Sequence, residues 1–77
     1  MIDEAKALRA LGERLKEARK RRGLTQEDLA EQCGFDPTYI SLLERGRRNP
    51  PFLTLCSLAD ELGCPLGDLM PAESLSR

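Results

Sequence analysis

Apolar residues recur every three or four positions along most of the chain, and this spacing predicts α-helices joined by short turns. The first helix is expected from about Asp3 to Arg22, where charged residues surround one apolar stripe. Gly12 lies inside this segment, and glycine costs up to ~1 kcal/mol in a helix interior. Residues 1–10 are therefore expected to form a frayed or separately angled extension, whereas Gly23 ends the helix after its basic last turn. The residues of the stripe are Leu8, Leu11, Leu15 and Ala18.

Capping residues predict two shorter helices in the middle of the chain. Thr25 is a suitable N-cap, and Asp28 three residues later completes a capping box. Gly34 is expected to stop this second helix. A third helix restarts with Asp36 as its N-cap and Pro37 at its first position, and it extends to about Arg45 and Gly46. The apolar residues assigned to the buried faces of these helices are Leu29, Ala30, Cys33, Ile40 and Leu43.

Prolines and a glycine delimit the last two predicted elements. The stretch RRNPP predicts a loop that leads into a fourth helix, from about Pro51 to Leu62, and Gly63 caps it. The stretch PLGDLM predicts a fifth short helical piece that carries Leu66 and Leu69. The expected core stripe of the fourth helix is Phe52, Leu55, Leu58, Ala59 and Leu62.

These elements predict an all-α fold, a compact five-helix bundle. The chain has 77 residues, so one small domain is expected, at residues 11–70, with the N-terminal helical extension before it and a frayed tail at residues 71–77. Only three aromatic residues are present, and few residues are β-branched, which also favours helices. A domain of this size buries a modest core, so self-association would stabilise it.

The N-terminus and the hydropathy predict a cytoplasmic protein. No apolar run approaches the roughly 20 residues of a membrane span, and the stretch MIDEAKALRA lacks the apolar core of a signal peptide. Neither a membrane nor a secreted context is therefore expected.

The three cysteines, Cys33, Cys56 and Cys64, lack the CxxC spacing of metal or redox motifs, and the chain has no histidine. Small buried hydrophobic residues in a reducing compartment are the favoured interpretation. A thiol redox sensor is a weaker alternative and a zinc site weaker still, so neither a metal nor another cofactor is expected. Because a glycine-rich phosphate loop is also missing, an enzyme is rejected.

The charge distribution changes what the net charge suggests. A net charge of −1 would by itself argue against a nucleic-acid partner. However, seven of the twelve Lys and Arg residues lie in two runs, at 19–22 and 45–48, while the acids lie mostly elsewhere. Such runs are usually solvated faces, but two of them on one surface would favour a polyanion such as DNA.

Residues 26–45 read as helix, tight glycine-containing turn, helix, with a small Ala30 where the two helices would pack closely. Gly34 can adopt the positive φ that a sharp turn requires. This pattern is typical of a DNA-binding helix-turn-helix formed by the second and third helices, whose third helix would project its N-terminal end into a major groove. An ordinary αα corner is the structural alternative.

From these motifs, the chain resembles the Xre or phage-repressor family of helix-turn-helix regulators, which includes restriction–modification controller proteins. The resemblance runs from LGERLKEARKRRGLTQEDLA through TYISLLERGRRNP to LADELGCPLGDLM, most of the chain. It implies a five-helix domain that binds double-stranded operator DNA as a homodimer and regulates transcription.

The resemblance also implies roles for single residues. Gln26 would touch a phosphate and brace the reading helix, while Arg19 and Glu44 would form an internal ion pair. The residues that would contact base edges are Pro37, Thr38, Ser41 and Leu42. Those that would contact phosphates, besides Gln26, are Tyr39, Arg45, Arg47 and Arg48.

Three of these assignments carry alternatives. Leu42 could equally pack inside the protein, and Tyr39 could be half-buried with its hydroxyl satisfied locally. Pro37 stands where restriction controllers often have an arginine, so their operator preference is not assumed, and DNA shape is expected to contribute more to specificity.

The partner surface of the expected dimer is assigned to the fifth helix, at Leu66, Leu69 and Met70, with possible help from the N-terminal helix. A different class of function uses the same fold. The chain could be a protein-interaction module, such as an antitoxin or a regulator partner, and an exposed apolar patch remote from the basic face would favour it.

Overall fold

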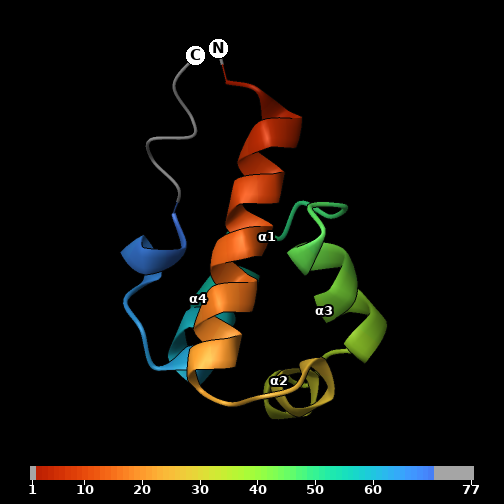
Figure 1. The fold of residues 1–77 in the computed structure, drawn as a ribbon, viewed down its shortest axis with the longest axis vertical. Helices are drawn as coiled ribbons and strands as arrows, with labels where there is room; N and C mark the ends of the chain where they lie inside the picture. Colours follow the sequence, from red (N-terminus) through yellow and green to blue (C-terminus); the bar gives the residue numbers. More distant parts are fainter. Residues whose placement is uncertain (1, 71–77) are drawn as a thin grey trace.

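The computed structural model describes residues 2–70, and within them it is all-α, as predicted. Four α-helices are present: α1 (Glu4–Arg21), α2 (Gln26–Cys33), α3 (Pro37–Glu44) and α4 (Phe52–Leu62). The expected fifth helical piece is a single 3₁₀ turn, η1 (Leu66–Leu69). In Figure 1, α1 runs along the length of the molecule, with α3 on one side, η1 on the other and α2 beneath α3.

The predicted capping residues of α2 and α3 are confirmed. The Thr25 hydroxyl accepts a hydrogen bond from the Asp28 amide, and the Asp28 carboxylate accepts one from the Thr25 amide, both at 3.0 Å. The Asp36 side chain accepts from the Thr38 amide at 2.7 Å, and Pro37 occupies the first turn of α3. Gly34 has φ 75°, the left-handed conformation expected at the turn between the two helices.

Gly12 does not interrupt the first helix, contrary to expectation. The residue is buried inside a continuous α1, and residues 4–10 extend the same helix. A Cβ atom at this position would lie 2.4 Å from the Glu44 carbonyl oxygen and 2.6 Å from that of Leu43. Glycine is present because the backbone at the end of α3 touches α1 here, and this approach outweighs the helix propensity.

The core lies between α1 and the other elements. One residue predicted to be in the core is exposed, and one residue predicted to be at the dimer interface is buried. Phe52, predicted as a core residue of α4, is 65% exposed, and its neighbour Leu53 is 74% exposed. Leu69 is fully buried. The buried apolar residues are Leu11, Leu15, Leu29, Ala30, Ile40, Leu43, Leu58, Ala59, Leu62 and Leu69.

None of the helices within residues 2–70 combines the length and the apolar character that a membrane crossing requires.

Candidate nucleic-acid interface

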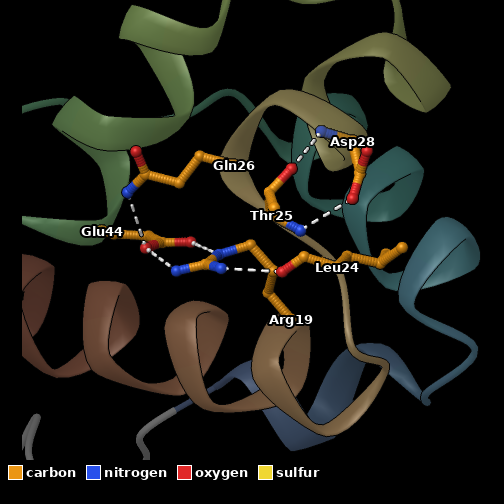
Figure 2. Close-up of polar contacts among 6 residues, drawn as sticks. All are labelled: Arg19, Leu24, Thr25, Gln26, Asp28 and Glu44. Atoms are coloured by element: carbon orange, nitrogen blue, oxygen red, sulfur yellow. Dashed lines mark hydrogen bonds and ion pairs between the residues drawn. The ribbon is translucent and has the colours of Figure 1, made fainter.

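A buried polar cluster joins the first three helices (Figure 2). Arg19 on α1 meets the Glu44 carboxylate on α3 in a two-pronged ion pair, with Nε to Oε2 at 2.6 Å and Nη2 to Oε1 at 3.0 Å. Gln26, the first residue of α2, donates its side-chain amide to the same carboxylate at 3.0 Å. The remaining Arg19 nitrogen, Nη1, donates to the Leu24 carbonyl at 2.8 Å. The expected ion pair is therefore present, and Gln26 braces α3 as the resemblance implied.

This cluster fixes the orientation of α3 relative to α1 and α2. The hydrogen bond that Arg19 donates to Glu44 is the main reason why the Arg19 pKa rises above its ordinary value, although burial opposes the rise. The guanidinium and the carboxylate each have hydrogen-bond partners, which is the condition for holding an ion pair inside a protein. Three hydrogen bonds to the Glu44 carboxylate thus hold the C-terminal end of α3, and a helix held in this way is preorganised to present its outer face to a rigid partner.

The outer face of α3 carries the residues expected to read bases. Pro37 and Thr38 are exposed at the N-terminal end of the helix, whereas Ser41 and Leu42 one turn later are half-buried. The four residues lie along the first turns of one helix, so a groove that admits the end of α3 would meet the two exposed ones first.

Tyr39, expected to reach the DNA backbone, is half-buried in the structure. Its ring packs edge-to-face against Phe35, with ring centroids 5.4 Å apart and planes at 81°. This contact joins α3 to the turn that precedes it. Tyr39 therefore supports the helix-turn-helix directly, and a phosphate contact would have to come from its hydroxyl end.

The second basic run is exposed and lies at the C-terminal end of α3. Arg45 is the C-cap residue of the helix, and Arg47 and Arg48 follow in the loop after Gly46. Arg9 on α1 joins them, because Arg9 and Arg45 line the same shallow hollow. Sequence inspection did not single out Arg9, since no local pattern connects it to residues that lie almost forty positions later.

The three arginines of the first basic run do not join the exposed cations at the end of α3. Arg19 is buried in the ion pair, and Arg21 pairs with Glu17 one turn back, at 3.7 Å. The Arg22 guanidinium lies beside Gly63 at the end of α4, where an added Cβ would be 2.9 Å from Nη1. The two basic runs look alike in the sequence. In the structure, the C-terminal end of α1 places Arg21 and Arg22 towards α4 and η1.

The three residues expected at a dimer interface differ in their exposure to solvent. Leu69 is fully buried within the protomer, so its assignment to the interface is wrong: a side chain in the core cannot contact a second molecule. Leu66 and Met70 are half-buried. Met70 lines an apolar groove together with Ile2, Leu8 and Leu55, and the exposed Phe52 precedes Leu55 by one helical turn.

All three cysteines are half-buried free thiols. Burial is the main reason why the pKa of Cys33 and that of Cys64 are raised, with the acidic neighbours Glu61 and Asp68 adding to the effect. A raised pKa disfavours the reactive thiolate, which fits the interpretation as small core-edge residues. No group of acidic or cysteine side chains within residues 2–70 is arranged to hold a metal ion.

Comparison with known proteins agrees with the local geometry. A family model described as helix-turn-helix matches residues 15–69. The chain is similar to the uncharacterized HTH-type transcriptional regulator y4dJ of Sinorhizobium fredii, with 47% identity over 53 residues that cover 69% of each protein. The chain spans about half the length of some other curated relatives.

Two solved structures share the fold over most of the chain. The restriction–modification controller protein C.AhdI from Aeromonas hydrophila superimposes with a TM-score of 0.79 at 38% identity, over 82% of this chain and 96% of that one. The master regulator for biofilm formation SinR, solved in complex with DNA, superimposes with a TM-score of 0.73 at 32% identity, over 77% of this chain and 95% of that one.

Proposed function

This chain belongs to the helix-turn-helix family of transcriptional regulators, and we propose that it acts as a dimer on a pseudo-palindromic DNA operator, with α3 in the major groove. The observation that carries this proposal is the polar cluster of Arg19, Gln26 and Glu44, which holds α3 with its N-terminal end exposed. A reading helix must keep a fixed angle to its supporting helices if its side chains are to meet base edges in register.

Base reading in this proposal begins at the N-terminal end of α3. Thr38 and Ser41 can exchange hydrogen bonds with several bases, and the Thr38 methyl group can meet a thymine methyl. Pro37 and Leu42 offer apolar contacts only. With so few polar groups for direct readout, sequence-dependent DNA shape would supply part of the specificity.

Phosphate contacts would come from both ends of the motif. Arg45, Arg47 and Arg48 are exposed at the end of α3, where each could neutralise one phosphate. Gln26 and Tyr39 would add hydrogen bonds from the other side. Because the net charge is only −1, the local excess of cations near α3 matters more to binding than the whole-chain total.

The dimer of this proposal would form through the apolar surface of Ile2, Leu8, Phe52, Leu53 and Met70. Phe52 and Leu53 are the most exposed large apolar side chains of α4, and water contact with them is unfavourable. This surface adjoins the 45–51 loop, so a two-fold axis through it would place the loops of both protomers near the operator centre. The two copies of α3 would then enter grooves about 34–36 Å apart.

A protein partner is the second candidate for the same apolar surface. The exposed Phe52 and Leu53 belong to α4, whereas the reading residues belong to α3, so an antitoxin or another regulator partner would bind side chains other than those that meet the bases. This alternative uses the same side chains, and the experiment below separates it from operator binding.

Selection from random-sequence duplex DNA at two salt concentrations tests the proposal. The expected result is an enriched two-fold symmetric site whose affinity falls steeply as salt rises. The matched variant is Thr38→Ala, which removes a base-reading side chain outside the polar cluster and should relax the preference at one position of each half-site. If wild-type protein enriches no sequence and binds weakly only at low salt, operator binding is wrong and the protein-partner function takes its place.

A further inference from the structure

Arg9 lies beside the loop that follows α3, although it belongs to the N-terminal half of α1. Gly46 in this loop has φ 72°, and a Cβ atom there would lie 2.9 Å from the Arg9 Cα. The two backbones are therefore in direct contact, and Figure 1 shows the loop against this part of α1. The backbone of Arg9 is therefore fixed by α1, to which it belongs, and by its contact with the turn at Gly46.

The surroundings of Arg9 carry an excess of positive charge. Arg9 and Arg45 share a hollow with Glu13 and Glu44, but the Glu44 carboxylate already accepts hydrogen bonds from Arg19 and Gln26. Glu13 is then the one acid of this hollow without such partners. Within residues 2–70, the exposed Arg9 side chain forms no ion pair.

Four arginines thus surround the end of α3 on the solvent side. Arg45, Arg47 and Arg48 come from the helix end and its loop, and Arg9 comes from a helix that is remote in sequence. A guanidinium presents several N–H donors in a plane that matches phosphate oxygens. An exposed group of such side chains next to a reading helix has the chemistry of a phosphate-binding surface.

We propose that Arg9 is a phosphate-contacting residue of the DNA interface, so that the N-terminal turns of α1 extend the surface formed by Arg45, Arg47 and Arg48. The inference rests on the proposed function and deepens it. Arg9 lies outside residues 15–69, the part of the chain that the family model matches. The tight contact between Gly46 and Arg9 makes α1 and the loop one continuous binding surface.

The test measures the salt dependence of binding to random-sequence duplex DNA, because phosphate contacts do not depend on sequence. The logarithm of the DNA-binding constant falls linearly with the logarithm of the salt concentration, and the steepness of this line decreases by about 0.9 for each phosphate contact that is lost. Arg9→Gln is expected to reduce the slope by about that amount per protomer, and by about 1.8 for a dimer with both copies on DNA. Arg9→Lys, which keeps the charge, should restore most of the slope.

Arg22→Gln is the matched control. It removes the same charge from another exposed arginine, but Arg22 is the C-cap residue at the opposite end of α1 and lies beside Gly63 at the end of α4. Its slope should equal that of the wild type, and circular dichroism should show equal helix content in all variants. An unchanged slope in Arg9→Gln, or an equal fall in Arg22→Gln, would overturn the inference.

Failure of the proposed function has a different signature. Wild-type protein would then show no salt-dependent binding to duplex DNA, and the assignment of Arg9 would fall with it. A purely structural role for Arg9 would instead lower the melting temperature of Arg9→Gln and leave the slope unchanged.

Discussion

Gly12 is the residue at which backbone packing contradicts local propensity. Gly12→Ala should raise helix propensity by ~1 kcal/mol, yet its methyl group would lie 2.4 Å from the Glu44 carbonyl oxygen. Because that neighbour is backbone at the end of α3, either α1 or α3 must shift. We expect a net loss of about 1–3 kcal/mol in the free energy of unfolding, measured by urea denaturation. A variant more stable than the wild type would show that the two helices separate without cost.

Glu44 stabilises the fold because its carboxylate is the partner of a buried positive charge. Glu44→Ala removes the partner of the buried Arg19 guanidinium, and an unpaired buried charge costs about 3–5 kcal/mol. The double variant Arg19→Met with Glu44→Leu replaces both charges by apolar groups of similar volume and should lose less than Glu44→Ala alone.

Urea denaturation of the single and double variants measures this coupling. The DNA-binding assay gives a second readout. The double variant is expected to fold, but it lacks the Glu44 carboxylate to which Gln26 donates a hydrogen bond. It should bind DNA more weakly even where its stability is restored. A double variant that is less stable than Glu44→Ala would argue that the ion pair is replaceable only by other polar groups.

At the scale of elements, the α2 cap makes stability depend on pH. The Asp28 pKa is lowered, chiefly by the hydrogen bond from the Thr25 amide and then by the Thr25 hydroxyl. A folded pKa below the unfolded one means that the stabilisation is complete above the unfolded value, near 3.9, and is lost as pH falls through the folded pKa. Asp28→Asn should therefore be less stable than the wild type at pH 7, and the difference should shrink below about pH 4.

Thermal unfolding of both proteins between pH 2 and pH 7 measures this effect. Glu31→Gln, which removes one exposed acid from the same helix outside the cap, is the matched control for the loss of a negative charge. A difference between Asp28→Asn and wild type that stays constant with pH would mean that the charge of Asp28 does not contribute.

The caps were predictable because their causes lie within four residues of sequence. Thr25 with Asp28, and Asp36 with Pro37, satisfy free helix N–H groups through local geometry alone. Gly34 likewise ends α2 because the turn needs a positive φ at that residue. Helix starts and stops therefore followed from the sequence without any knowledge of the packing.

Contacts between elements were not predictable in the same way. The spacing of Phe52 matches the α4 stripe, but the first turn of α4 extends beyond the core, so its side chain is exposed. Leu69 is buried because the 3₁₀ turn folds back onto α1 and α4. Both outcomes depend on where chain segments meet in space, and helical periodicity carries no such information.

At the scale of the whole molecule, the same limit applies to the charge pattern. The two basic runs look equivalent along the chain, but α1 directs Arg21 and Arg22 towards α4, while the run at 45–48 lies beside α3. Arg9, which is remote in sequence, lines one hollow with Arg45 of that run. The resulting molecule has a cationic region at the end of α3 and, next to the loop that carries it, an apolar surface at the start of α4.

The apolar surface gives a prediction about assembly. Leu53 is 74% exposed, so Leu53→Glu should leave the protomer fold unchanged, and a glutamate in the first turn of α4 is favourable for the helix. If α4 contributes to the proposed dimer, the new charge would be buried against its copy and like charges would meet across the two-fold axis. Sedimentation velocity should then show a shift from dimer to monomer, and DNA binding should lose its cooperativity.

Two further variants separate assembly from folding. Gln32→Glu adds the same charge on α2, away from the apolar surface, and should sediment as the wild type does. Leu69→Glu places a charge in the core and should unfold the protomer instead of dissociating an intact dimer. If Leu53→Glu self-associates as strongly as the wild type, the start of α4 lies outside the dimer interface. The exposed Phe52 and Leu53 would then be the surface to test against a protein partner.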